Sequence, residues 1–269
     1  MNQTEASIII PTYNRAALLK QAIDSCLKQT VHCQIIVCDH GSTDNTPQIM
    51  SEYSNQNILY IRREKDFGPH FAWLEAALHC SHTWVHIQYD DDWIEPDFMQ
   101  KLLSLTADDV GLVCSDAKIF FDAKNMYESS VFFKKLQTGL HPSSMAYKKL
   151  MRTVISPGAC LLRKDEIVNN LFVGNLPLAK THYFGVGPDI LFGLSSCINY
   201  PKFGYLQEQL AIFRAHEGSI TTDAQNNNKH KSINNAYNEA RKYARVLKIN
   251  NGNGFLSFVF HLFFGKKKQ

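Results

Sequence analysis

The chain has 269 residues, of which 45% are hydrophobic and 20% are charged, as is typical of a globular protein with a sizeable core. This length corresponds to one domain with elaborations. The net charge of +3 is too small to indicate a nucleic-acid partner, and we expect none.

The seven cysteines show no repeated CxxC spacing, so we expect reduced, buried thiols in a cytosolic protein. The opening MNQTEASIII lacks the ordered basic, apolar and small-residue regions of a secretory signal. No apolar run approaches the roughly 20 residues that span a bilayer. We therefore expect a cytoplasmic protein that touches a membrane, at most, from the inner face.

Strand and helix patterns alternate along the first third of the chain. Short apolar runs predict buried strands at 7–11, 34–38, 58–61 and 84–89. Apolar residues at helical spacing predict helices at 16–29, 43–53 and 71–78, with Thr46 as the cap before Pro47. This alternation indicates an α/β fold with an open, mostly parallel sheet flanked by helices.

The pattern beyond residue 108 is mixed. We expect a strand at 110–114, another that ends at Phe121, and an irregular excursion over 122–150. A strand candidate at 156–163 leads into a helix, and a further helix begins near Gly187. Residues 216–233 are polar and predict a loop, which a helix over about 234–247 follows.

Polar residues follow three of the predicted strands at the point where each strand ends. In open parallel sheets, ligands bind beyond these carboxyl ends. We therefore expect convergence on one crevice of the following residues: Thr12, Tyr13, Asn14, Asp39, His40 and Asp90 to Asp92.

The acids Asp90, Asp91 and Asp92 stand together at the end of an apolar strand. Clustered carboxylates repel one another, and Mg²⁺ combines one or two carboxylates with substrate phosphates. A solvated turn or a helix cap is the alternative interpretation of such a triplet. Its position beside two other polar strand ends favours a metal site.

Five segments, in this order, resemble the signatures of glycosyltransferase family 2: SIIIPTYNR at 7–15, IIVCDHGSTDNT at 35–46, YDDDWIEPDF at 89–98, GPDILFGL at 187–194 and FRAHEGSIT at 213–221. The resemblance implies a GT-A type sheet and an enzyme that moves a sugar, with inversion, from a nucleotide diphosphate donor to an acceptor hydroxyl. It also implies Mg²⁺ or Mn²⁺ as cofactor. The glycosyltransferase domain would cover 1–222, with a nucleotide-binding half at 1–108 and an acceptor and catalytic half at 109–222, followed by a helical extension at 223–269.

The resemblance also implies roles for single residues. Asp189 would be the catalytic base and Arg214 would contact the diphosphate. The metal would lie at Asp90, Asp92 and His216. The nucleotide would contact Pro11, Thr12, Tyr13, Arg15, Asp39, His40 and Asp91. A UDP-sugar is the favoured donor, but His40 stands where many relatives carry an acid or amide that addresses the base, so the base stays open.

Many relatives carry an Arg-Asn pair where this chain has Trp73 and Leu74. A phosphate contact made there in relatives is therefore absent or supplied by Arg62, Arg63 or Lys65.

Alternatives stay open for the function. Burial of Asp189 in an apolar stretch would raise its pKa and suit a base, but an acid in a first helical turn also simply stabilises the helix. A sugar nucleotidyltransferase shares a nucleotide-binding α/β half with acidic metal residues. A non-catalytic nucleotide-binding module on the same fold is the other alternative.

The C-terminal sequence FLSFVFHLFFGKKKQ begins at Phe255 and places three lysines after a mostly apolar run. A helix of this composition can lie on an anionic membrane surface, here through residues 255–268. Such a contact would suit a glycan or lipid-linked acceptor in surface polysaccharide assembly. The alternative is a helix packed on the domain with a charged, solvated end.

Overall fold

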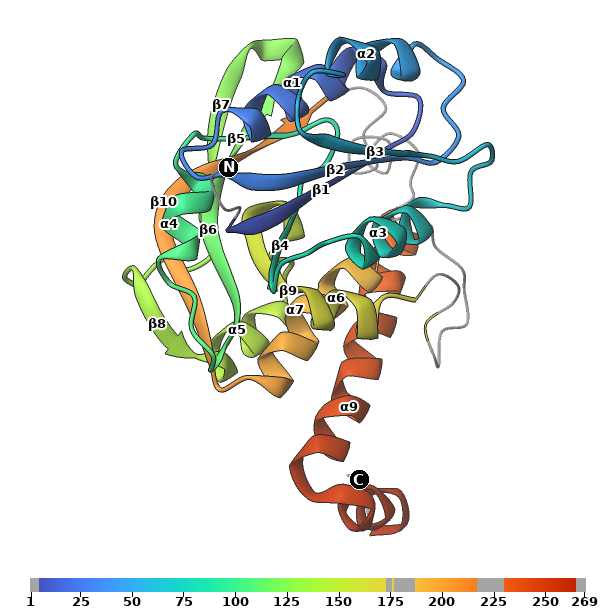
Figure 1. Cartoon of the computed structure of the whole chain (residues 1–269). Helices are drawn as coiled ribbons and strands as arrows, with labels where there is room; N and C mark the ends of the chain where they lie inside the picture. The colour runs from blue at the N-terminus through green and yellow to red at the C-terminus, as the bar shows by residue number, and fades with distance from the viewer. Residues whose placement is uncertain (1–4, 173–175, 177–186, 217–229, 265–269) are drawn as a thin grey trace.

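The computed structural model describes residues 5–172, 176, 187–216 and 230–264. In this part of the chain, ten strands form one sheet in the order β3-β2-β1-β4-β9-β6-β10-β5, with β7 beside β6 and β8 beside β10. Helices flank the sheet (Figure 1). The expected α/β fold with an open sheet flanked by helices is confirmed. The sheet is mixed: the strands of its first half pair in parallel, as expected, whereas β5, β7, β8 and β9 pair antiparallel with their neighbours.

The first half of the domain is a set of parallel strands joined by helices. Strands β1 and β2 pair from Ala6 opposite Cys33 to Thr12 opposite Asp39, so both end at the same level. Helices α1 and α2 lie on one side of these strands and α3 lies on the other (Figure 1). The elements are β1 (Ala6–Thr12), α1 (Ala16–Leu27), β2 (Cys33–Asp39), α2 (Thr46–Glu52), β3 (Ile58–Arg62), α3 (Pro69–Leu78) and β4 (Trp84–Ile87).

These elements confirm the strands and helices predicted for the first half. One detail was wrong: Thr46 is the first residue of α2 and not its cap. The Asp44 carboxylate instead accepts hydrogen bonds from the Thr46 N–H at 3.0 Å and from the Ala16 N–H at 3.0 Å. One side chain therefore fixes the starts of α1 and α2.

Two long parallel strands, β6 and β10, organise the second half. Strand β9 runs antiparallel between β4 and β6 and so joins the two halves of the sheet. The elements are β5 (Trp93–Ile94), α4 (Phe98–Leu103), β6 (Val110–Phe121), η1 (Asp122–Lys124), β7 (Met126–Ser130), β8 (Gly139–Pro142), α5 (Ser143–Leu150), η2 (Pro157–Ala159), β9 (Cys160–Arg163), α6 (Lys164–Asn170), α7 (Pro188–Asn199) and β10 (Lys202–Ala215).

Several predictions for the second half were wrong. The two strands expected between residues 110 and 121 are one continuous strand, β6. Residues 122–150, expected to be irregular, contain β7, β8 and α5. The residues of β7 are almost all exposed, so no buried apolar face marks it as a strand. The strand candidate at 156–163 begins only at Cys160, after η2.

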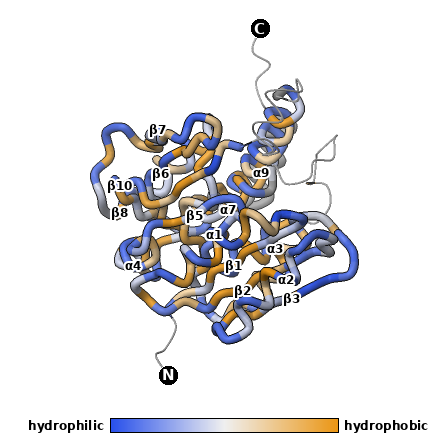
Figure 2. The backbone as a smooth tube through the Cα atoms, turned by 90° about the horizontal axis from the view of Figure 1, so that it is seen from above, coloured by the Kyte–Doolittle hydropathy of each residue, from blue (hydrophilic) through white to orange (hydrophobic). Residues whose placement is uncertain are grey.

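The C-terminal helix α9 (His230–Phe264) is longer than the predicted helix at 234–247. Ala236, Ala240 and Ala244 are buried at a spacing of four residues, and this part of α9 packs against α7. Figures 1 and 2 show that the rest of α9 extends away from the body of the domain.

The predicted loop at 216–233 lies largely outside the described residues. The side chains of residues 252–269 also lie outside them, so both interpretations of the tail stay open. Across the described ranges, none of the helices combines the length and hydropathy needed to cross a bilayer.

The core follows the strands of the sheet. Hydrophobic residues run through β1 and β2 in the middle of the molecule, whereas the outer loops are hydrophilic (Figure 2). Ile8, Ile9 and Ile10 of β1 are fully buried, because both faces of this central strand are covered. All seven cysteines are free thiols; five are buried, as predicted, whereas Cys33 and Cys197 are half-buried.

Candidate active site

The polar ends of β1, β2 and β4 come together, as the predicted topology requires. The His40 N–H donates to the Thr12 carbonyl at 3.3 Å, which joins the ends of β1 and β2. Arg15, in the loop after β1, forms an ion pair with Asp91 and lies 3.5 Å from Asp90. The loops after three neighbouring strands therefore line one site.

Asp39, at the end of β2, is fully buried and its oxygens are engaged by the protein. Oδ1 accepts the Ser42 N–H at 2.8 Å. Oδ2 accepts the Tyr60 hydroxyl at 2.8 Å and lies 3.4 Å from Arg62 Nε. These contacts hold the loop after β2.

A flat aromatic surface lies beside this loop. The rings of Tyr13 and His40 stack with centroids 5.0 Å apart and planes 20° apart. His40 is buried, and its Nδ1 lies 2.6 Å from Asp66 Oδ1, which also accepts the Gly68 N–H at 2.6 Å. Tyr13 is 38% exposed, so the stacked pair presents an aromatic face on which a base could stack.

Two of the acids that follow β4 are buried and have raised pKa values. Asp90 and Asp92 are each only 8% exposed. Burial raises the pKa of Asp90 to about 7, the Arg15 charge opposes this rise, and the Asp91 charge adds to it. Burial also raises the pKa of Asp92 well above its ordinary value, and repulsion from Asp91 adds to the rise. A cation at this place would therefore relieve the repulsion.

The end of β10 brings two predicted residues to the acids. The Arg214 N–H donates to Asp92 Oδ1 at 2.8 Å, and His216 Nε2 lies 3.1 Å from Asp91 Oδ2. The Arg214 guanidinium lies over the Trp93 ring at 5.1 Å and 3.7 Å from Asp122. It is thus the main chain of Arg214, and not its guanidinium, that contacts the acids.

A divalent cation bound together with a diphosphate fits these residues. No three His, Cys, Asp or Glu side chains of the described segments form a cluster that would hold a metal alone. Mg²⁺ normally needs only one or two carboxylates, because phosphate oxygens and water complete its coordination. The acids after β4 and His216 bring oxygen and nitrogen donors to the same strand ends, since Asp92 Oδ1 accepts the Arg214 N–H and His216 lies 3.1 Å from Asp91, next to Asp90 and Asp92.

Asp189 lies in the first turn of α7 and is 7% exposed. Its Oδ1 accepts the N–H groups of Gly187 at 2.8 Å and Ile190 at 2.9 Å, and the Tyr237 hydroxyl lies 3.5 Å from Oδ2. Burial raises the pKa of Asp189 to about 6, although the two backbone hydrogen bonds oppose the rise. The residue therefore supports a helix start and is also poised to exchange a proton near neutral pH.

Tyr89 connects Asp189 with the acids. Burial raises the pKa of Tyr89 well above its ordinary value, and the charges of Asp189 and Asp92 raise it further. Both carboxylates thus lie close enough to Tyr89 to act on its hydroxyl. Trp73, which is 3% exposed, packs against Tyr89 at 5.9 Å and Phe192 of α7 at 6.2 Å.

The structure adds residues that the sequence patterns did not point to. Tyr60, Asp66 and Tyr237 contact Asp39, His40 and Asp189, and all three come from distant segments. Of the cations considered as phosphate contacts, Arg62 lies beside Asp39 and Arg63 pairs with Glu75.

Parallel strands that end in clustered acids, together with a buried carboxylate in the first turn of α7, are compatible with an α/β enzyme that binds a nucleotide. The model of the family "Glycosyl transferase family 2" matches residues 7–170, more than half of the chain. The chain belongs to glycosyltransferase family 2.

Characterised relatives share part of the chain. It is 32% identical over 110 residues to the chondroitin synthase of Escherichia coli, a match that covers 40% of this chain and 16% of that protein. It is 25% identical over 154 residues to WfgD of Escherichia coli, named as a UDP-Glc:alpha-D-GlcNAc-diphosphoundecaprenol beta-1,3-glucosyltransferase, with 56% of this chain and 57% of that protein covered. The chain therefore spans a small part of the first relative and just over half of the second.

Solved structures with the same fold include S. aureus TarS 1-349 in complex with UDP-GlcNAc. It has a TM-score of 0.65 and 17% sequence identity, and the match covers 96% of this chain and 75% of that chain. The mannosyltransferase PcManGT from Pyrobaculum calidifontis, in complex with GDP-Man and Mn2+, has a TM-score of 0.56 and 15% identity and covers 98% of this chain and 77% of that chain. At these identities the likeness concerns the fold alone.

Proposed function

We propose that this glycosyltransferase uses a UDP-sugar and Mg²⁺ or Mn²⁺, inverts the anomeric centre, and employs Asp189 as its base. One observation carries the proposal: Asp189, a buried carboxylate with a pKa of about 6, and Asp92, one of the buried acids at the strand ends, both act electrostatically on the same buried side chain, Tyr89. A proton acceptor and a diphosphate site would then flank one sugar. The UDP-GlcNAc complex of TarS and the UDP-Glc donor in the name of WfgD support a uridine donor.

The donor would bind along the strand ends. Tyr13 and His40 would stack on the base, and Pro11 and Thr12 at the end of β1 would border the nucleoside. Asp91 and Arg15 would orient the ribose and diphosphate, while Asp90, Asp92 and His216 would hold the metal. Arg214 contributes its N–H to this arrangement by fixing Asp92. When bound, the metal supplies Lewis-acid stabilisation of the leaving diphosphate.

The transfer step requires one bond to form and one to break. The acceptor oxygen attacks the anomeric carbon from the face opposite the diphosphate, the carbon–oxygen bond to the diphosphate breaks, and Asp189 takes the hydroxyl proton. An ionised Asp189 is required for this step, and its pKa of about 6 keeps it ionised at neutral pH. Attack opposite the leaving group inverts the anomeric centre.

The acceptor would be a glycan or a lipid-linked saccharide in surface polysaccharide assembly, at the cytoplasmic face of the membrane. The named acceptor of WfgD is a lipid diphosphate, and the apolar, lysine-ended tail of this chain suits a nearby anionic surface.

A thermal-shift screen of UDP, GDP, CDP and ADP, each with and without Mn²⁺, tests the donor site. Stabilisation grows as RT ln(1 + [L]/Kd), so UDP with Mn²⁺ should raise the melting temperature most. Release of UDP from a UDP-sugar in the presence of acceptor would then report transfer. Release of pyrophosphate from UTP and a sugar phosphate would contradict the proposal and indicate a nucleotidyltransferase.

A further inference from the structure

A hollow of about 600 Å³ lies in the second half of the sheet, outside the site described above. It opens where one outer strand of the sheet ends and the next outer strand begins. On β10, β8 pairs with residues 202–205 and β5 with 211–212. Between these two pairings the described residues form single contacts: the Gln207 N–H donates to Thr138 Oγ1 at 3.0 Å, and the Leu210 carbonyl accepts the Glu95 N–H at 2.8 Å. On β6, β9 pairs as far as Cys114 and β7 begins only at Ala117.

Irregular pairing of β10 turns polar side chains into this hollow. The register of β10 against β6 shifts between Leu206 and Gln209 and again between Gln209 and Ala211. Gln207, Glu208 and Leu210 are therefore extra residues of β-bulges, and all three line the hollow. Bulges re-aim side chains and are common beside functional sites.

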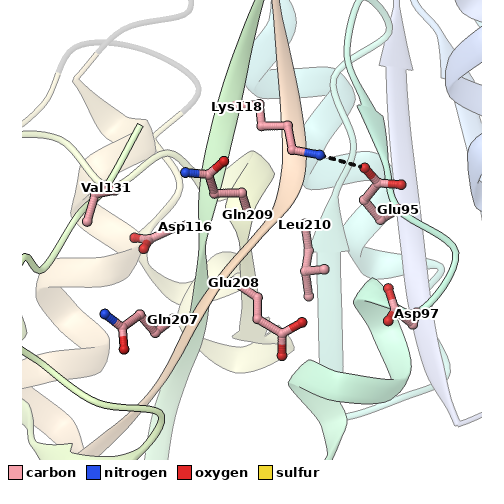
Figure 3. A pocket seen from close by; sticks show the side chains of 9 residues that line it. All are labelled: Glu95, Asp97, Asp116, Lys118, Val131, Gln207, Glu208, Gln209 and Leu210. Atoms are coloured by element: carbon pink, nitrogen blue, oxygen red, sulfur yellow. Dashed lines mark hydrogen bonds and ion pairs between the residues drawn. The ribbon is translucent and has the colours of Figure 1, made fainter. Parts of the chain in front are cut away.

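Most of the residues that line the hollow are polar, and most of these carry planar carboxylate or amide groups. Glu95 and Asp97 lie on one side of the two strands, with Asp116 and Gln207 on the other (Figure 3). Lys118 spans the hollow to Glu95 at 3.1 Å. Asp116 is buried, and its two oxygens accept the Phe132 N–H and the Tyr205 hydroxyl. The other carboxylates and the amides of Gln207 and Gln209 offer acceptors and donors, which suit the vicinal hydroxyl groups of a sugar ring.

A row of aromatic rings runs from the residue after Asp92 to Tyr127, whose ring lies 6.0 Å from Nζ of Lys118, a residue that lines the hollow. Trp93 follows Asp92 directly, and its ring lies 5.5 Å from Phe120, which lies 4.8 Å from Tyr127. Paired residues share a face of a sheet: Phe120 pairs with Tyr127, and Ile212 pairs with both Trp93 and Lys118. The rings thus lie on the same face as the hollow. Tyr127 is 54% exposed and offers a surface for the apolar face of a sugar.

The hollow lies on the same strand as the end of β10 that contacts Asp92. Leu210 precedes Arg214 by four residues on β10, or about 13 Å along the strand. That distance corresponds to a short oligosaccharide. A site for the acceptor chain should be continuous with the reaction centre, and the row from Trp93 to Tyr127 provides this continuity.

We propose that the hollow between β5, β7, β8 and the bulged part of β10 binds the acceptor saccharide at sugars remote from the reacting hydroxyl. This inference rests on the proposed function, since it takes the acceptor to be a glycan. The occupant is an oligosaccharide of neutral hexoses or N-acetylhexosamines. Anionic saccharides are disfavoured, because Glu95, Asp97, Asp116 and Glu208 outnumber Lys101 and Lys118 at this place.

Binding of defined tetrasaccharides to the full chain tests the inference. Cellotetraose, maltotetraose and chitotetraose serve as neutral probes and a hyaluronan tetrasaccharide as the anionic probe, in saturation-transfer NMR and calorimetry with UDP and Mn²⁺ present. At least one neutral probe should bind, and at least tenfold more tightly than the anionic one. Failure of all three neutral probes to bind overturns the proposal.

Substitutions then locate the binding. The double variant Gln207→Ala/Gln209→Ala should weaken binding of the neutral probe by about tenfold, and Tyr127→Ala by about fivefold. The matched controls Gln56→Ala and Leu59→Ala change exposed residues at the opposite edge of the sheet and should have no effect. Parent-like binding by both hollow variants overturns the proposal.

The same samples separate this inference from the proposed function. Thermal stabilisation by UDP with Mn²⁺ should be equal in the parent and in all these variants, because the hollow does not contact the donor. If UDP stabilises the parent but the hollow variants bind saccharide normally, the acceptor site is wrong and the donor site stands. The parent could instead bind saccharide, the hollow variants lose that binding, and UDP stabilise none of these proteins. In that case the donor assignment alone would be wrong.

Discussion

Replacing Asp189 with asparagine removes one charge from the first turn of α7 and keeps its shape. An asparagine oxygen can accept the two N–H groups that Asp189 Oδ1 accepts now, from Gly187 and Ile190. The asparagine amide can donate to the Tyr237 hydroxyl, which lies 3.5 Å from Oδ2. The variant should therefore fold.

The structure predicts that this variant is more stable than the parent at neutral pH. Burial raises the pKa of Asp189 from its ordinary 3.8 to about 6, so ionisation of this carboxyl destabilises the folded state. At 1.36 kcal/mol for each pH unit, the difference amounts to about 3 kcal/mol above pH 6. Below pH 3.8 both states of the parent carry a neutral carboxyl, and the advantage of the variant should vanish.

The same substitution should abolish most of the transfer activity. Loss of a general base typically lowers the rate by 10²–10⁴-fold. In the parent, kcat/KM should fall as the pH decreases through about 6, because protonated Asp189 cannot accept a proton. The variant should lack this acidic limb and should bind UDP as the parent does.

Urea unfolding of both proteins between pH 4 and pH 8, together with a UDP-release assay, measures both effects. A gain in unfolding free energy that grows with pH, combined with a large loss of kcat, is the expected result. Equal stabilities at pH 8 would refute the assigned burial of the charge. A kcat close to that of the parent would refute the role of Asp189 as base.

Three further changes have defined outcomes. Tyr237→Phe removes a hydroxyl that lowers the pKa of Asp189, so the acidic limb of kcat/KM should move to higher pH by a few tenths, and an unmoved limb would contradict the contact. Asp92→Asn should abolish the Mn²⁺-dependent part of UDP stabilisation in a thermal-shift assay; a parent-like Mn²⁺ response would exclude Asp92 as a ligand. Gly187→Ala should lose about 1–2 kcal/mol in urea unfolding, because Gly187 has φ +100° and a new Cβ would meet the Ala236 carbonyl at 3.2 Å. Unchanged stability would show that the backbone adapts there.

The sequence predicted the half of the fold in which burial is uniform. Strands β1 and β2 are buried on both faces, so their apolar runs stand out from the polar loops that follow. Strand β7 is exposed and β6 changes from fully to partly buried along its length, so neither carries a single periodic signal. Their strand structure depends on pairing with partners that sequence periodicity does not reveal.

The residues of the site were likewise predicted only in part from the sequence. Topology alone predicted that Thr12, Asp39 and the acids after β4 would meet, and the structure brings them together. The partners that tune these groups could not be predicted, because they come from remote segments. Asp66 reaches His40 from the loop after β3, and Tyr237 reaches Asp189 from α9.

The contact between α9 and the start of α7 has a practical consequence for anyone who shortens this protein. The family match ends at residue 170, before Asp189, β10 and α9. A truncated chain that stops there would lose Asp189, the proposed base, and one that stops at residue 229 would lose the Tyr237 hydroxyl that lies 3.5 Å from the Asp189 carboxyl. A chain that extends past Ala244 keeps the three buried alanines of α9, in the part of that helix that packs on α7.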